Sequence, residues 1–202
     1  MTSFCAWLLA HGSSCLELVA VLFGIAGVYL SIPESIWNWP IGMINVALFA
    51  VLFWQQHFYA NAGLQVVYFG LSVYGWYQWL HGGAERTELT VARTPPRIGG
   101  GAVVATIAAW AILYFVVRRM PGPTMSLTDT ATTAVSLVAE WMLAKKLIEN
   151  WAVWIVIDAI YVGMFVADGL YLTAINYAIY FVLAVMGLVA WRRTLATQTA
   201  MA

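Results

Sequence analysis

ENWAVWIVIDAIYVGMFVADGLYLTAINYAIY, residues 149–180, is the stretch that decides the fold of this chain. It is apolar over two membrane-crossing lengths and breaks only at the turn Ala167-Asp168-Gly169, so it predicts two spanning helices. Polar and aromatic side chains recur along both helices at helical spacing and therefore share one face of each. They are Trp151, Trp154, Asp158 and Tyr161 on the first helix, and Thr173, Asn176, Tyr177 and Tyr180 on the second. In lipid, such a stripe must face protein, water or a ligand.

The composition of the whole chain is that of an integral membrane protein. Of its 202 residues, 63% are hydrophobic and 9% are charged, whereas soluble domains have about 45–50% and about 25%. Spanning helices of roughly 20 residues fill nearly all of the chain and leave no room for a soluble catalytic domain. The net charge of zero gives no indication of nucleic-acid binding, and Cys5 and Cys15 make neither a metal site nor a disulfide framework. We expect a lipid-embedded protein without a cofactor.

Seven stretches are predicted to be transmembrane helices, which gives an all-α membrane protein. Their approximate bounds are 15–32, 38–55, 61–79, 98–117, 124–144, 150–166 and 169–191. We treat residues 1–202 as a single membrane domain. Within it we expect a first three-helix bundle (15–80), a connector helix (98–118) and a second three-helix bundle (124–193).

Three further helices of this set also carry polar side chains, whereas the connector carries no stripe of strongly polar groups. Asn45 lies in the middle of 38–55. The helix 61–79 has Gln65, Tyr68, Ser72, Trp76 and Trp79 along one face, and the helix 124–144 has Asp129, Thr133, Ser136 and Glu140. Several stripes of this kind predict a common polar centre inside the bundle.

Some of these residues also have plain structural explanations. Trp37, Trp39 and Trp79 lie near helix ends, where we expect them to anchor in the membrane interface, and Trp151 could share that role. Thr132, Thr133 and Ser136 could join helices to one another.

Some acidic residues also have a structural explanation, and one does not. Asp129 lies near a helix start, where a carboxylate favours the helix dipole, and Asp168 belongs to a turn with Gly169. Asp158 is harder to explain by structure alone, because a carboxylate in the middle of a span is costly and usually paired or functional.

The positive charges predict the orientation in the membrane. With seven crossings, Arg86, Arg93, Arg97, Lys145, Lys146, Arg192 and Arg193 fall on one side, and Arg118 and Arg119 on the other. Since cytoplasmic loops carry the excess of Lys and Arg, we expect the N-terminus outside and the C-terminus in the cytoplasm.

The two bundles resemble each other in sequence. The helices at 38–55 and 150–166 open with Asn-Trp and carry Asn45 and Asp158 about two turns on. The next helices open with a Gly-Leu pair, at 63–64 and 169–170, and the predicted connection is shorter in the second copy. Three helices, a connector and three helices give a 3+1+3 parallel repeat about an axis along the membrane normal, an arrangement in which transporters hold substrate between the halves.

Three strings carry a more specific resemblance: NWPIGMIN (38–45), YANAGLQVVYFGLSVYGWYQW (59–79) and KKLIENWAVWIVIDAIYVGMF (145–165). Over residues 15–193 the chain resembles the PnuC family of bacterial vitamin-precursor transporters, whose architecture is similar to that of SWEET sugar transporters with an extra connecting helix. The resemblance implies facilitated diffusion of nicotinamide riboside across the inner membrane, trapping by a cytoplasmic kinase, and a homotrimer.

The resemblance also implies a substrate site with a pair of Trp residues and polar side chains from several helices. Together with the stripes, it leads us to expect substrate contacts from Trp151, Trp154, Asp158, Asn45, Gln65, Asn176, Tyr177, Tyr180, Tyr68, Ser72, Ser136 and Glu140. Glu140 is not part of the family pattern, and relatives carry thiamin or riboflavin, so the substrate stays open at this stage.

The chemistry of these residue types suits a flat cation. Indole and phenol faces attract a cationic ring by about 0.5–2 kcal/mol, and Asn and Gln side chains both donate and accept hydrogen bonds. Nicotinamide riboside and thiamin both fit, whereas riboflavin is larger and neutral. A membrane enzyme is disfavoured because the chain has no HExxH or GxSxG motif and no His near a helix centre. Proton-coupled transport is the main rival, since Asp129, Glu140 and Asp158 could carry protons.

Overall fold

The computed structural model describes residues 15–120 and 126–201 and folds most of them into helices. These are α2 (Cys15–Ser31), α3 (Asn38–Gln55), α4 (Tyr59–His81), α5 (Pro96–Val117), α6 (Leu127–Ala144), α7 (Glu149–Ala167) and α8 (Tyr171–Met201), with a 3₁₀ turn η1 (Ala84–Arg86). Within these ranges no strand is present, and one isolated bridge joins Ala92 to Leu147. The predicted all-helical class is therefore confirmed.

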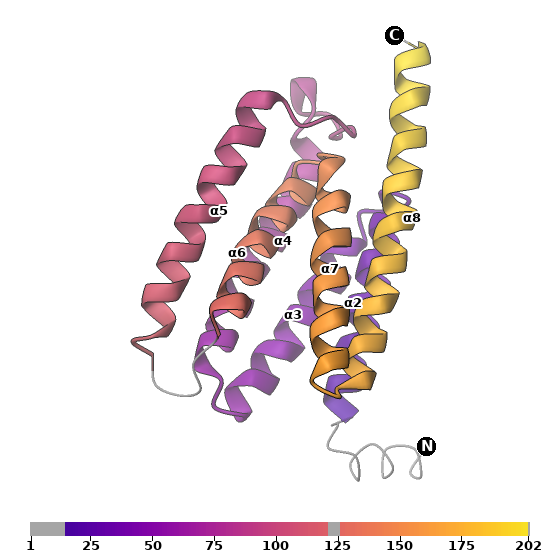
Figure 1. Cartoon of the computed structure of the whole chain (residues 1–202). Helices are drawn as coiled ribbons and strands as arrows, with labels where there is room; N and C mark the ends of the chain where they lie inside the picture. Colours follow the sequence, from indigo (N-terminus) through magenta and orange to yellow (C-terminus); the bar gives the residue numbers. More distant parts are fainter. Residues whose placement is uncertain (1–14, 121–125, 202) are drawn as a thin grey trace.

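Six of the helices form a closed ring, and α5 lies outside it (Figure 1). Going round the ring, the packed neighbours are α2 and α3, α3 and α4, α4 and α6, α6 and α7, α7 and α8, and finally α8 and α2. Helix α5 packs against α6. The interior of the ring is where the candidate site lies.

The outer surface of the ring is suited to lipid. Four helices, α3, α5, α7 and α8, are long and apolar enough to cross a membrane, and α2 is apolar but one residue shorter than α3. Helices α4 and α6 are less apolar because they bury polar side chains, among them Ser72 on α4 and Thr133 and Ser136 on α6. Large apolar side chains such as Val66, Val104 and Ile112 are exposed on the outside. The chain is an integral membrane protein.

The observed helices follow the predicted ones closely, except at the C-terminus. Helix α8 continues to Met201, about ten residues beyond the predicted end at 191. The tail RRTLATQTAM contains no Gly or Pro, so nothing in it breaks the helix.

Asp129 caps a helix and Asp168 lies in a turn, as predicted. At the start of α6, Ser126 and Asp129 form a capping box, in which each side chain satisfies a backbone N–H of the other. Asp168 follows the last residue of α7, and Gly169 has a positive φ of 73° in the same turn, a conformation that glycine adopts without strain. Residues 124 and 125, predicted as the start of this helix, lie outside the described residues.

The helices before and after α5 have matching bounds. Helices α2, α3 and α4 begin at residues 15, 38 and 59, and α6, α7 and α8 begin at 127, 149 and 171. The segments that join α3 to α4 and α7 to α8 each have three residues, so the expected shorter connection in the second copy is wrong. The starts of α2 and α6, and of α4 and α8, differ by 112 positions, and those of α3 and α7 by 111. The offset of 112 also separates Glu34 from Lys146 and the Asn-Trp pair at 38–39 from that at 150–151, and at this offset Asp158 corresponds to Val46 rather than to Asn45.

Four buried tryptophans pack in pairs at the end of the ring where α2 turns into α3 and α6 turns into α7. Trp39 and Trp79 meet edge-to-face with centroids 5.3 Å apart, and Trp151 and Trp191 meet in the same way at 5.4 Å. All four side chains are at most 3% exposed. The predicted interfacial position of Trp39 and Trp79 is therefore wrong, whereas Trp37 is exposed.

Two glycines explain why the indoles of Trp39 and Trp151 can be buried. The ring of Trp39 lies directly on Gly75 of α4, where a β-carbon would overlap it. The ring of Trp151 lies on Gly187 of α8 in the same way, and a β-carbon there would be 2.6 Å from the indole. A sequence pattern of Trp near helix ends cannot reveal these partners, because the glycines come from a different helix.

Candidate functional site

The ring encloses a chamber with two adjoining lobes. The first lobe has a volume of about 290 Å³ and the second about 250 Å³. Both lobes are lined by Val28, Ser31, Tyr68, Glu140, Leu143, Trp154 and Tyr180. Because these seven residues belong to both linings, the lobes lie side by side and share a wall.

The first lobe, here called the aromatic lobe, is lined mainly by α6, α7 and α8. Besides the shared residues it has Thr133, Ser136, Trp151, Ile157, Asp158, Tyr161, Tyr177 and Ala184. Tyr177 packs against Tyr161 with centroids 4.6 Å apart and against Phe165 at 5.3 Å. The hydroxyl of Tyr161 donates to Thr132 Oγ1 at 2.8 Å, which fixes the ring. Several aromatic faces thus surround a space suited to a flat ring.

The second lobe, here called the amide lobe, is lined mainly by α2, α3 and α4. Its own residues are Gly24, Gly27, Asn38, Trp39, Gly42, Asn45, Val46, Phe49, Gln65 and Ser72. Side-chain amides and a hydroxyl dominate its polar part, and such groups donate and accept hydrogen bonds without carrying charge.

Two of the amides in this lobe are held in place by hydrogen bonds. Asn45 Nδ2 donates to the carbonyl of Ala20 at 2.7 Å, and Asn38 Nδ2 donates to Ser31 Oγ at 2.9 Å. The Oδ1 atom of Asn38 is buried and has no hydrogen-bond partner. Gly24 allows Asn45 to approach α2, since a β-carbon at this position would be 2.9 Å from Asn45 Nδ2 and would overlap the Tyr180 hydroxyl.

Two carboxylates face the chamber. Asp158 is 4% exposed and lines the aromatic lobe, and Glu140 lines both lobes. Neither lobe has a Lys, Arg or His in its lining. In the described part of the chain the one salt bridge joins Lys146 to Glu34, and the hydrogen bonds of that part include none to Asp158 or Glu140. The chamber therefore contains two carboxyl groups for which the described residues supply neither a basic side chain nor a hydrogen-bond donor.

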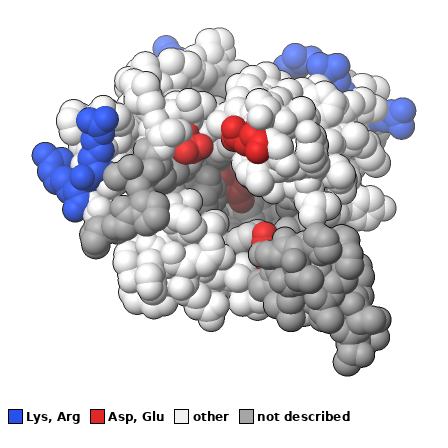
Figure 2. Space-filling model, turned by 60° about the horizontal axis from the view of Figure 1, so that its bottom comes forward, with Lys and Arg blue, Asp and Glu red and all other residues white. Residues whose placement is uncertain are grey.

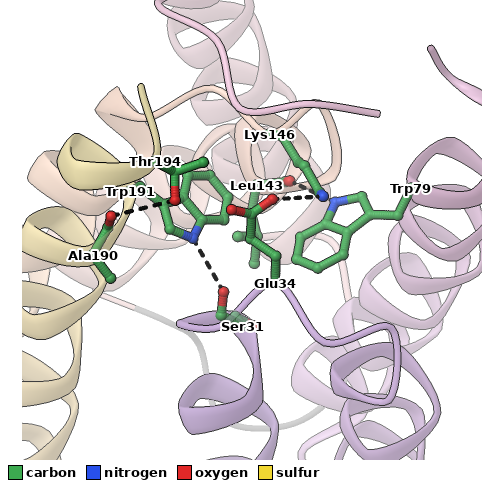
Figure 3. Close-up of polar contacts among 8 residues, drawn as sticks. All are labelled: Ser31, Glu34, Trp79, Leu143, Lys146, Ala190, Trp191 and Thr194. Atoms are coloured by element: carbon green, nitrogen blue, oxygen red, sulfur yellow. Dashed lines mark hydrogen bonds and ion pairs between the residues drawn. The ribbon is translucent and has the colours of Figure 1, made fainter. Parts of the chain in front are cut away.

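Polar contacts join the two sides of the ring at the end that carries the buried tryptophans, here called the closed end (Figure 3). Trp79 Nε1 donates to the Leu143 carbonyl at 3.1 Å, and Trp191 Nε1 donates to the Ser31 carbonyl at 3.2 Å. Lys146 Nζ pairs with Glu34 at 2.8 Å. Each of these three contacts joins the α2–α4 side of the ring to the α6–α8 side.

The loop that follows α4 covers this closed end. Its Val91 is 3% exposed, and Ala92 exchanges backbone hydrogen bonds with the α6–α7 turn, to Lys146 and from Ile148, both at 3.0 Å. Thr94 then donates from its backbone and its hydroxyl to Glu149 at 2.8 and 2.6 Å.

The opposite end of the ring is hollowed. Figure 2 shows this face, with acidic side chains gathered in and around the hollow and Lys and Arg side chains at the periphery of the view. A cation that approaches this end meets negative charge before it reaches the aromatic lobe.

Eleven of the twelve side chains predicted to contact substrate line one or both lobes. Asn176 is the exception: it is half-buried on α8 and contributes to neither lining. The prediction omitted Ser31, Asn38, Thr133 and Tyr161. Asn38 shares a helix face with Asn45, Thr133 with Glu140, and Tyr161 with Asp158. Helical spacing could therefore have added Asn38, Thr133 and Tyr161 to the predicted substrate contacts.

A family model described as "Nicotinamide mononucleotide transporter" matches residues 14–193. Among curated proteins, the nicotinamide riboside transporter PnuC of Escherichia coli (strain K12) is 27% identical over 88% of this chain and 85% of its own length. The riboflavin/roseoflavin transporter RibM of Streptomyces davaonensis is 26% identical over 87% of this chain and 83% of its own length.

Among solved structures, a crystal structure of the vitamin B3 transporter PnuC superimposes with a TM-score of 0.74. It is 22% identical in sequence, and the match covers 95% of this chain and 86% of that one. At this identity the likeness establishes the shared helical fold.

Proposed function

The chain belongs to the PnuC family of membrane transporters, and on that premise we propose that it carries nicotinamide riboside by facilitated diffusion. It is a transporter of the inner-membrane type and not an enzyme. A cytoplasmic kinase would trap the substrate by phosphorylation, because a charged phosphate cannot leave through the same chamber as readily.

The observation that carries the proposal is the pairing of an aromatic, acidic lobe with an amide lobe. Nicotinamide riboside has a flat pyridinium cation, a carboxamide and a ribose. We assign the pyridinium ring to the aromatic lobe, between Trp154 and the tyrosines, where cation–π attraction contributes about 0.5–2 kcal/mol. Asp158 offsets the charge of the ring.

The ribose then extends into the amide lobe. Asn45 and Gln65 are the amides we assign to its hydroxyls, since an amide donates and accepts at once, and Ser72 lies beside them. The hydroxyl of Ser72 itself donates to the Tyr68 carbonyl at 2.9 Å, so its oxygen is left to accept from the ligand.

We further propose that α2–α4 and α6–α8 are two copies of a parallel repeat that rock against each other around the substrate. The matching helix bounds and the equivalent contacts of α4 with α6 and of α8 with α2 support this arrangement. All seven helices would then cross the membrane, with the basic, closed end in the cytoplasm, the N-terminus outside and the C-terminus inside.

A homotrimer remains a prediction from the family resemblance. The mass of the protein–detergent complex measured by light scattering tests it. A protein mass of one chain per complex would contradict it.

A different vitamin is the second candidate substrate. RibM is nearly as similar to this chain as PnuC is, so riboflavin is an alternative substrate, and thiamin shares the flat cationic character of nicotinamide riboside. The two carboxylates in the chamber favour a cation over neutral riboflavin.

Uptake into proteoliposomes tests both the substrate and the mechanism. We expect radiolabelled nicotinamide riboside to equilibrate across the membrane without accumulating and without sensitivity to a protonophore. Accumulation above the outside concentration that collapses on adding protonophore would overturn facilitated diffusion in favour of proton coupling. No uptake of nicotinamide riboside, with uptake of riboflavin or thiamin, would overturn the assigned substrate.

A further inference from the structure

We propose that Glu140 is a specificity-determining residue that selects substrates with a positive charge at the bond joining their flat ring to their polar tail. This inference rests on the proposed function and deepens it.

Glu140 lies at the junction of the two lobes. It lines both the aromatic and the amide lobe, so it lies where the two lobes join. A ligand with its ring in one lobe and its tail in the other must place the bond between them at this junction. Asp158, by contrast, lines only the aromatic lobe and faces the ring itself.

The carboxyl group of Glu140 has no basic partner among the described residues. No Lys, Arg or His lines either lobe, and in residues 15–120 and 126–201 Glu140 is not in a salt bridge. Asp158 is buried, is equally unpaired among the described residues and also faces the chamber. Since an unpaired carboxylate in a partly desolvated chamber favours a cationic partner, a ligand cation is the partner that the geometry leaves open.

The chemistry of the ligand fits this junction. In nicotinamide riboside the pyridinium nitrogen that bears the formal charge is the atom bonded to the ribose. Adding a hydride to the ring gives the dihydro form, which keeps the same ring, amide and sugar but is neutral. The two molecules therefore differ in charge at the position that Glu140 faces, with little difference in size.

The first half of the ring offers a matched site for a control. Val28 lies 112 residues before Glu140, the separation also found between Glu34 and Lys146, and it too lines both lobes. A carboxylate moved from α6 to α2 by Val28→Glu in a Glu140→Gln background thus faces the same junction from the other side.

Calorimetric titration of the purified protein with nicotinamide riboside and with its dihydro form tests the proposal. The wild-type protein should prefer the cation by about tenfold or more. Glu140→Gln should lose most of that preference while still binding the neutral form, and Val28→Glu with Glu140→Gln should regain part of it.

The outcomes separate the two proposals. Binding of nicotinamide riboside with an unchanged preference in Glu140→Gln would overturn the role of Glu140 and leave the proposed function standing. Failure of the wild-type protein to bind either form would overturn both. Asp158→Asn serves as the comparison: if it alone abolishes the preference, the charge is read in the aromatic lobe and not at the junction.

Independently, we infer that the closed end of the chamber is a reversible clasp between the halves. Trp79 and Trp191, 112 positions apart, donate to the carbonyls of Leu143 and Ser31, which are also 112 apart. The contacts are thus reciprocal, with each half donating one indole N–H to the other. Lys146 and Glu34 pair across the same boundary.

The clasp must open for substrate to leave at this end. Three hydrogen-bonded contacts join the halves there, and the Lys146 ammonium also lies 4.6 Å from the centroid of the Trp79 ring. The ion pair is the most readily altered of these contacts, because Glu34 and Lys146 lie in turns and not inside helices.

Labelling of an introduced cysteine tests the clasp. Ser31→Cys, in a background with Cys5 and Cys15 replaced by Ser, places a thiol beside the clasp and the chamber. In inside-out vesicles, Glu34→Gln should raise its labelling by an impermeant thiol reagent several-fold, and the exchange Glu34→Lys with Lys146→Glu should bring labelling back down. Equal labelling in all three backgrounds would overturn the inference.

Discussion

The two sides of the ring, α2–α4 and α6–α8, carry matching side chains at one end but line the chamber differently. At the closed end, positions 112 residues apart carry the same side chain: Asn38 and Asn150, Trp39 and Trp151, Gly75 and Gly187, Trp79 and Trp191. The indole–glycine contacts and edge-to-face indole pairs that result are nearly the same in both halves.

Inside the chamber the same offset joins unlike side chains. The pairs are Val28 and Glu140, Gly42 and Trp154, Asn45 and Ile157, Val46 and Asp158, and Gln65 and Tyr177. The second half supplies both carboxylates and the larger share of the aromatic faces, and the first half supplies the amides. Matching side chains suit the contact between the two sides of the helix ring. A ligand with an aromatic group at one end and a sugar at the other needs two different binding surfaces.

The strongest test of this division is Trp154→Ala. Position 154 lines both lobes in the second half, and its counterpart Gly42 has no side chain to replace it. Loss of the indole face should weaken binding of nicotinamide riboside by about 30-fold or more, as measured by calorimetry. Trp54→Ala, which removes an exposed indole on α3, should leave affinity unchanged; equal losses in both variants would contradict the assignment.

The shared scaffold is tested by adding a methyl group under each indole. Gly75→Ala and Gly187→Ala should each lower the melting temperature of the detergent-solubilised protein, by about 3–10 °C, because the β-carbon overlaps a buried Trp ring. Gly163→Ala is the control, since a β-carbon there meets nothing within 4 Å. A large drop in only one of the two halves would show that the indole contacts are not equivalent.

The amide lobe should contribute less than the aromatic lobe. Gln65→Ala removes one neutral hydrogen-bonding group, so it should weaken binding by about three- to tenfold. Gln55→Ala, an exposed amide on the same half, serves as the matched control in the same titration. An effect of Gln65→Ala as large as that of Trp154→Ala would reverse the proposed ranking of the lobes.

The smallest effect is expected at Asn176. It was predicted from the sequence to contact substrate, but it lies outside both linings, so Asn176→Ala should change affinity by less than about twofold. A tenfold loss would mean that Asn176 reaches the substrate in another state of the chamber.

The sequence predicted the helices and most of the chamber for one physical reason. A spanning helix must be apolar, so each polar side chain in it stands out, and helical spacing then assigns it to a face. Asp158, Glu140 and Gln65 were found in this way. Ser31, which lines both lobes, gave no such signal because it ends its helix.

Contacts between helices distant in sequence could not be predicted from spacing. The burial of Trp39 depends on Gly75, and that of Trp151 depends on Gly187. The pair of Glu34 with Lys146 spans 112 residues. The correspondence between halves was misjudged because the Gly-Leu pairs at 63–64 and 169–170 match by composition but not by position in their helices.

The central claim is that the chamber binds a flat vitamin cation, and one calorimetric panel tests it most directly. Purified wild-type protein is titrated with nicotinamide riboside, thiamin and riboflavin under the same conditions. We predict that nicotinamide riboside binds most tightly and that riboflavin binds weakly or not at all. Tight binding of riboflavin without binding of nicotinamide riboside would contradict the account.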